Sequence, residues 1–143
     1  MIMSVIVFGS LNTYLVTVVP RLPVAGETLT GRKFFTAACG KGANQAVAAA
    51  RLGVPTRLVG RVGNDAFGAE LISGLRQSGV RTEGIVADES THSGVASITV
   101  DEAGENTIAI VAGANGRVDE SDVERLRQWL SGATALLLQL EVP

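Results

Sequence analysis

Cysteine, aromatic residues and any excess of one charge are scarce in this sequence. Cys39 is the only cysteine, which excludes an internal disulfide and a zinc site made of several cysteines, and we expect no bound metal. The 12 Lys and Arg residues nearly balance the 14 Asp and Glu residues. The charge therefore does not indicate a nucleic acid or a membrane surface as a partner.

Long apolar runs are lacking as well. No stretch reaches the roughly 18 apolar residues that a membrane helix requires. Residues 1–7 are apolar but too few for a secretory leader, and they have neither a basic start nor a small-residue cleavage site. We therefore expect a cytoplasmic protein.

Aliphatic residues, by contrast, are plentiful. Hydrophobic residues make up 46% of the 143 residues and aromatic residues only 4%, so the core must be built from Val, Leu, Ile and Ala. Such side chains suit a parallel sheet covered by helices. The length is that of one compact domain.

The first half of the chain alternates strand and helix patterns. We predict strands at 4–8, 14–19 and 56–62, an extended segment at 28–37, and helices at 42–52 and from Asp65 to Gly79. Asn64 or Asp65 can cap the second helix. This alternation is typical of a doubly wound α/β sheet.

A β-hairpin is predicted next, because segments 94–100 and 107–111 flank a turn-rich link. Ala96, Ile98 and Val100 share one face of the hairpin, which we expect to be dry, while the other face is largely wet. A small appended sheet suits this pattern better than the central sheet does.

The last part of the chain predicts a helix and a final strand. Residues 121–124 match a capping box for a helix ending at Gly132, with Val123 on its apolar stripe, and 135–140 predict a buried parallel strand. Such a strand needs neighbours, yet the sequence stops three residues after it. We expect the sheet to be incomplete and its open edge to favour association.

A glycine-rich segment at 39–44 lies between a strand-like segment and the alanine-rich helix. Gly40 and Gly42 would let a ligand approach the backbone, and a helix N-terminus favours oxygen-rich or anionic groups. The glycine spacing around Lys41 matches neither a phosphate-binding P-loop nor a dinucleotide fingerprint. A tight turn into the helix explains the same residues, and both interpretations stay open.

Two polar residues fall at predicted strand ends. Asn12 follows the first strand, and Glu141 closes the last one. Ligands of open α/β sheets bind outside the carboxyl ends of the strands, where an amide and a carboxylate could hydrogen-bond sugar hydroxyls. Each residue could also be an ordinary loop residue or cap.

Six segments, taken together, resemble the ribokinase family of carbohydrate kinases. They lie at 9–12 (Gly-Ser-Leu-Asn), 23 with 26–28, 40–46, 60–68, 112–115 and 138–141 (Leu-Gln-Leu-Glu). Their order and spacing cover the whole chain. The stretch 43–53 and the Gln-Leu-Glu ending are more similar to the ribokinase branch than to the fructokinase or adenosine kinase branches.

The resemblance implies a fold and a set of binding residues. The fold would be a ribokinase-like doubly wound parallel sheet, incomplete here, with a small β-sheet lid whose strands lie at about 14–37 and 84–111. Two lids would pair to form a dimer. Sugar hydroxyls would be contacted by Asn12, Gly40, Lys41, Asn44 and Glu141, and the apolar wall of the lid would be formed by Ala96, Ile98 and Ile110.

Two residues depart from the family pattern inside this site. Tyr14 stands where the family has an Asp that holds sugar hydroxyls, and a phenol cannot replace a carboxylate that accepts two hydroxyl protons. Cys39 replaces the first of two glycines before the lysine, and its side chain would either strain a turn or narrow the pocket. We expect weak or no sugar binding.

The catalytic parts that the resemblance implies do not occur in these residues. The family's catalytic Asp belongs to a C-terminal Gly-Ala-Gly-Asp motif, which this sequence lacks, and the sites for ATP, Mg²⁺ and a monovalent cation also lie in the C-terminal half. Phosphoryl transfer depends on positioning and charge stabilisation, so we expect no such cofactor on this chain alone and no activity. Three functions stay open: a fragment or a separately encoded sugar-binding half of a kinase, a non-catalytic sugar-binding or dimerisation module, and a remnant that folds by self-association.

Overall fold

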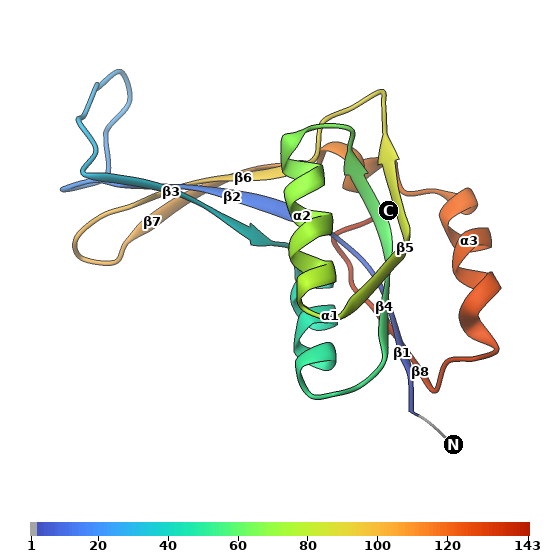
Figure 1. Cartoon of the computed structure of the whole chain (residues 1–143). Coiled ribbons are helices and arrows are strands. Elements are labelled where there is room, and N and C mark those ends of the chain that lie inside the picture. Colours follow the sequence, from blue (N-terminus) through green and yellow to red (C-terminus); the bar gives the residue numbers. More distant parts are fainter. Residues whose placement is uncertain (1–2) are drawn as a thin grey trace.

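The computed structural model describes residues 3–143, so Met1 and Ile2 of the apolar N-terminal run lie outside it. Its elements in chain order are β1 (Val5–Phe8), β2 (Asn12–Val18), β3 (Lys33–Cys39), α1 (Lys41–Arg51), β4 (Thr56–Gly63), α2 (Ala66–Gln77), β5 (Val80–Asp88), β6 (Gly94–Val100), β7 (Asn106–Val111), the 3-10 turn η1 (Gly113–Arg117), α3 (Glu120–Leu130) and β8 (Ala135–Leu138). They form a layered α/β body from which a second, smaller sheet projects (Figure 1).

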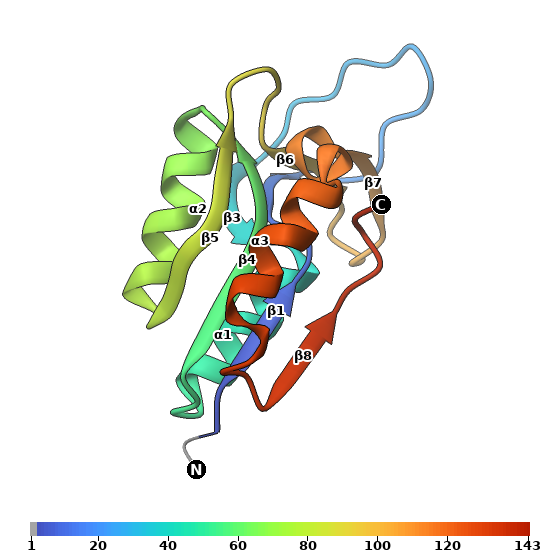
Figure 2. The same cartoon turned by 90° about the vertical axis from the view of Figure 1, so that its right-hand side faces the viewer.

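A parallel four-stranded sheet in the order β5-β4-β1-β8 forms the centre of the body. β1 lies between β4 and β8, with Val5 paired to Thr56 on one side and to Ala135 on the other. Helices α1 and α2 cover one face of the sheet, and α3 covers the other (Figures 1 and 2). The predicted doubly wound α/β architecture is therefore confirmed.

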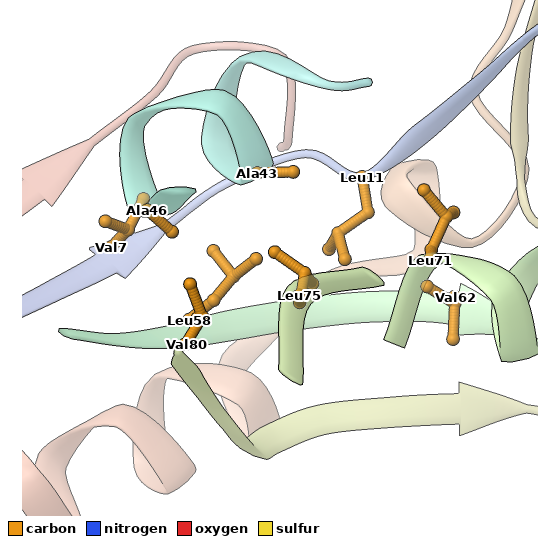
Figure 3. Close-up of a cluster of buried hydrophobic side chains, with 9 residues drawn as sticks. All are labelled: Val7, Leu11, Ala43, Ala46, Leu58, Val62, Leu71, Leu75 and Val80. Carbon is orange, nitrogen blue, oxygen red and sulfur yellow. The ribbon is translucent and has the colours of Figure 1, made fainter. Parts of the chain in front are cut away.

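Aliphatic side chains fill the layer between the sheet and the α1–α2 pair (Figure 3). The nine buried members of this core are Val7, Leu11, Ala43, Ala46, Leu58, Val62, Leu71, Leu75 and Val80. The two alanines are on α1 and bring that helix close to β1 and β4. A second cluster, which includes Phe8, Val59 and Leu126, fills the α3 face. Burial of this apolar area, at about 25 cal/mol per Å², stabilises the body.

The smaller sheet has the order β3-β2-β6-β7 and mixes both strand directions. β2 pairs antiparallel to β3 and parallel to β6, and β6 pairs antiparallel to β7. The predicted hairpin is confirmed as β6 and β7. The range expected for the appended sheet was too wide, because β5 pairs parallel to β4 and residues 84–88 thus belong to the central sheet.

One face of the smaller sheet is apolar but only partly dry. Ala96 is 1% exposed, whereas Ile110, its direct partner on β7, is 64% exposed. Ile98 and Val100 are half-buried. The expectation of a dry face was therefore wrong for the outer strand, because no layer of the described chain covers β7 (Figure 1).

Helix α3 begins earlier than its sequence pattern suggested. Asp119, not Ser121, is the N-cap: its carboxylate accepts from the Ser121 backbone amide, and the Asp122 side chain accepts from the amide of Asp119. Both carboxylates also bind Arg61, so a tertiary contact selects this capping box. Val123, expected on the apolar stripe, is 38% exposed.

Strand β8 is shorter than the predicted 135–140 and lies at the edge of the central sheet. Within residues 3–143 it pairs with β1 alone, and Leu138 is 63% exposed. The expectation of a buried strand was therefore wrong for this chain. Among the described helices, none combines the length and the apolar character needed to cross a membrane.

Candidate functional site

The residues predicted to bind a ligand come from distant parts of the chain and meet at the carboxyl end of β1. Asn12 begins β2, Gly40 joins β3 to α1, Lys41 begins α1, and Glu141 follows β8. The smaller sheet starts at the same place, because the Asn12 position pairs with Gly94 of β6. The carboxyl end of a parallel sheet is where such folds bind their ligands.

The glycines of the 39–44 segment allow it to pack directly on the chain that follows β1. Gly40 has a φ of +104°, and a Cβ on it would lie 2.6 Å from the Ser10 carbonyl oxygen. A Cβ on Gly42 would lie 2.6 Å from the Gly9 carbonyl carbon. The Ala43 amide donates to the Ser10 carbonyl at 3.1 Å. Backbone packing alone is therefore sufficient to require both glycines, which agrees with the interpretation of this segment as a tight turn into the helix.

Glu141 is held as a carboxylate by two partners. Its Oε1 lies 2.8 Å from Lys41 Nζ, and its Oε2 accepts from Ser10 Oγ at 3.0 Å. The hydrogen bond from Lys41 lowers the pKa of Glu141 below its ordinary value, partial burial opposes this, and Ser10 lowers it further. The buried side chain of Gln139 accepts from the Ser10 amide at 3.0 Å, which fixes this loop against the end of β8.

Asn12 is oriented by a second asparagine, Asn115 of η1, which is 2% exposed. Asn115 Nδ2 donates to Asn12 Oδ1 at 2.9 Å and to the Leu11 carbonyl at 2.8 Å, while its Oδ1 accepts from the Leu11 amide at 2.9 Å. Asn12 Oδ1 is therefore engaged, and its Nδ2 can meet a ligand oxygen. Asn115 was not predicted as a site residue. Its only signal in the sequence was its place in the segment 112–115 (Ala-Gly-Ala-Asn), one of the six segments that carry the family resemblance.

Tyr14 and Cys39 contact each other. Asn12 pairs directly with Cys39 across β2 and β3, so Tyr14, two residues further along β2, lies on the same face. A hydrogen bond with Cys39 is the main cause that raises the pKa of Tyr14 to about 12, followed by burial and by the charges of Cys39 and Glu141. Asn44 Nδ2 also donates to Cys39 Sγ at 3.5 Å. The two departures thus form one polar pair that engages Asn44.

Ala96, Ile98 and Ile110 lie on the same face of the smaller sheet as Tyr14. Ala96 pairs with Tyr14 on one side and with Ile110 on the other, and Ile98 follows two residues along β6. The three apolar side chains extend away from the polar cluster toward the outer strand. Ile110 is the least covered of them.

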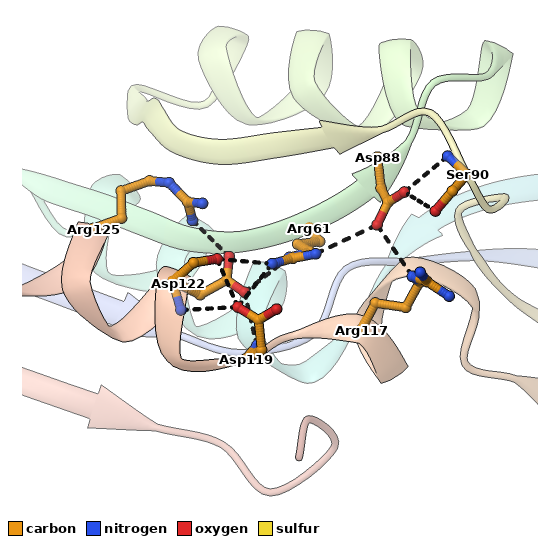
Figure 4. A network of polar contacts seen from close by, with 8 residues as sticks. Arg61, Asp88, Ser90, Arg117, Asp119, Asp122 and Arg125 are labelled. Carbon is orange, nitrogen blue, oxygen red and sulfur yellow. Dashed lines mark hydrogen bonds and ion pairs between the residues drawn. The ribbon is translucent and has the colours of Figure 1, made fainter.

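A charged network lies beside this cluster, at the carboxyl ends of β4 and β5 (Figure 4). Arg61 Nε lies 2.8 Å from Asp122 Oδ2, and its other nitrogens lie 3.0 Å from Asp119 and 3.4 Å from Asp88. Asp122 is completely buried. Because η1 immediately precedes these capping residues of α3, the network anchors the segment that carries Asn115.

The described part of the chain contains no group of side chains suited to bind a metal ion. Within residues 3–143, no three His, Cys, Asp or Glu side chains are grouped as a metal ion would require.

Comparison with known sequences and structures agrees with this architecture. The pattern of the pfkB family carbohydrate kinases matches residues 3–140. The chain belongs to this family.

Its similar relatives include several ribokinases. The ribokinase of Schizosaccharomyces pombe is 44% identical over 98% of this chain and 46% of that protein, and the Mus musculus ribokinase is 43% identical over 97% and 43%. The structure of Arabidopsis thaliana ribokinase complexed with ribose and ATP matches with a TM-score of 0.86 at 35% identity, over 100% of this chain and 47% of that one. The chain thus spans less than half the length of the relatives it matches.

Proposed function

We propose that this chain forms the sugar-binding part of an ATP-dependent carbohydrate kinase of the ribokinase type. The observation that carries the proposal is the polar cluster of Asn12, Lys41 and Glu141 at the carboxyl end of β1, where the smaller sheet begins. Family membership and the ribokinase names of its relatives support ribose as the sugar.

Each residue of the cluster has a chemical role in this proposal. Asn12 Nδ2 and Lys41 Nζ donate to sugar oxygens, and the Glu141 carboxylate accepts from sugar hydroxyls. Gly40 and Asn44 contribute contacts from the start of α1. Ala96, Ile98 and Ile110 form the apolar wall of the smaller sheet, which serves as a lid over the sugar.

Phosphoryl transfer requires parts that these 143 residues do not supply. The charge that develops on the transferred group must be stabilised, and the attacking hydroxyl must lose its proton to a positioned base. We propose that a C-terminal kinase half contributes the base, the anion hole and the sites for ATP, Mg²⁺ and a monovalent cation. The proposed location is the cytoplasm.

Ribose phosphorylation by the purified chain, with and without a separately produced C-terminal half of a ribokinase relative, tests this proposal. We expect no ATP-dependent ribose 5-phosphate from the chain alone and measurable turnover with the added half. Turnover that appears with the added half should disappear in Glu141→Gln if Glu141 holds the sugar. Appreciable turnover by the chain alone would refute the proposed division of labour.

A non-catalytic role is the second candidate, as a sugar-binding or lid-mediated dimerisation module. The exposed apolar side chains of the smaller sheet favour it: Phe35 is 41%, Ile108 54% and Ile110 64% exposed. If the chain dimerises through this sheet and no added half restores turnover, this second function is the better account.

A further inference from the structure

A pocket of about 360 Å³ lies at the amino ends of the central strands, at the opposite end of the sheet from the candidate sugar site. Residues of β1, β4, β5 and the C-terminal end of α3 line it, among them Arg57, Arg81 and Trp129. Arg57 is the second residue of β4, six residues before its end at Gly63, so about 20 Å of strand separates the two sites. The volume lies at the lower end of the range of small-molecule sites, about 300–1,000 Å³.

Two guanidinium groups stand side by side in this pocket. Arg57 of β4 and Arg81 of β5 are direct partners in the parallel register, so both side chains leave the same face of the sheet. That face is the α3 face, because the Arg57 guanidinium lies 4.3 Å from the centre of the Trp129 ring. Like charges at directly paired positions destabilise a sheet, and an anion bound between the two guanidinium groups would relieve this repulsion.

Carboxylates compensate these two charges poorly. In the described part of the chain, Arg57 has one ion-pair partner, Glu83, at 3.6 Å, and the side chain of Glu83 is 65% exposed. Arg81 makes no ion pair among residues 3–143. Arg61, further along β4, by contrast has three carboxylates within 3.4 Å. The C-terminal carbonyls of α3 add only about half a negative charge, so the pocket stays net positive.

Arg57 is held in place by packing rather than by an acid. Its side chain is 16% exposed, and its Nε is buried without a hydrogen-bond partner in the described chain. The Trp129 ring therefore fixes the orientation of the guanidinium before any ligand arrives. A preorganised arginine fork next to a second, exposed arginine suits the bidentate recognition of a tetrahedral oxyanion.

We propose that this pocket binds a phosphate group, either as the free ion or as a small phosphate monoester. The terminal nitrogens of Arg57 and the guanidinium of Arg81 hold the phosphate oxygens, and the side chains of Gln128 and Ser131, which also line the pocket, can donate further hydrogen bonds. The proposal does not depend on the function proposed above, since it shares no residue with the candidate sugar site.

The only tryptophan of the chain, Trp129, gives a direct readout. We expect its fluorescence to change saturably when inorganic phosphate is added at constant ionic strength, and potassium chloride alone to have no such effect. Arg81→Gln should raise the dissociation constant at least about tenfold, since hydrogen bonds to charged groups are strong. Arg127→Gln removes the same charge from an exposed position on α3 and is the matched control, for which we expect an unchanged affinity.

A parallel titration with methyl phosphate shows whether the site binds the monoester or the free ion, and either result supports the proposal.

Several outcomes would overturn it. A signal that does not saturate at millimolar phosphate, or one that Arg81→Gln leaves unchanged, would exclude the site. Loss of binding in Lys41→Gln with retention in Arg81→Gln would place the phosphate at the start of α1 instead. Because Arg81 is exposed, its variant should keep the fold, and thermal unfolding followed by circular dichroism checks this.

Discussion

At the residue scale, the contact between Tyr14 and Cys39 determines which hydrogen bonds the candidate site can offer to a sugar. Tyr14 stays protonated at neutral pH, since its pKa is about 12, so it offers one hydroxyl where a carboxylate would accept two hydrogen bonds. Asn44 Nδ2 donates to Cys39 Sγ at 3.5 Å, so this nitrogen already has a partner before a sugar binds. The two residues act as a pair, and changing one alone leaves the other in the site.

We therefore predict that the double variant Tyr14→Asp with Cys39→Gly binds ribose at least about tenfold tighter than the natural chain, because a carboxylate accepts stronger hydrogen bonds than a phenol. Each single variant should gain less than the double. Tyr14→Phe removes the hydroxyl and restores no acceptor, so it is the matched control and should show no gain. Calorimetric titration with ribose measures the natural chain and all four variants. Micromolar binding by the natural chain, or no gain in the double variant, would contradict this explanation.

At the scale of elements, the link between β4 and the start of α3 depends on one buried ion pair. Asp122 is fully buried and accepts from Arg61 Nε at 2.8 Å and from Arg125 at 2.6 Å. Asp122→Asn removes the buried one of the three carboxylate charges around Arg61 and should lower the free energy of unfolding by about 1.5–3 kcal/mol, since hydrogen bonds between charged groups are strong. Glu124→Gln, which affects an exposed pair on the same helix, should change it by less than about 0.5 kcal/mol. Urea unfolding compares the two, and equal effects would show that the network is dispensable.

Local patterns predicted most elements but not the contacts that choose between alternatives. The alanine-rich run was sufficient to predict α1, and the Asp65 cap to predict the start of α2, because helix propensity and capping are local. Strand β5 was not predicted. Its charged residues Arg81 and Glu83 alternate with residues that face α2, and this alternation hides the apolar pattern of a buried strand. The start of α3 was misplaced, since Arg61, some sixty residues earlier, selects Asp119 as the cap. Asn115 was missed for the same reason, as its partners are far away in sequence.

At the scale of the whole molecule, two groups of exposed apolar side chains lie on strands in the part of the chain that the structure describes. On the smaller sheet, Ile108 and Ile110 of β7 are 54% and 64% exposed, on the same face as the candidate site. At the edge of the central sheet, Leu138 of β8 is 63% exposed beside an open strand edge. Exposed apolar patches and unpaired edges both favour association. The smaller sheet offers the larger group, since Phe35 of β3 adds to the same face.

We predict that the chain self-associates through the smaller sheet. Sedimentation velocity should show a dimer at micromolar concentration, and Ile108→Ser with Ile110→Ser should shift it to the monomer, because the buried apolar area that drives association is lost. Leu52→Ser changes an 83% exposed side chain at the end of α1, remote from both surfaces, and should leave the dimer intact. If Leu138→Lys rather than the β7 variant produces the monomer, the open edge of the central sheet is the contact. A natural chain that stays monomeric at high concentration would exclude both surfaces as interfaces between copies of this chain.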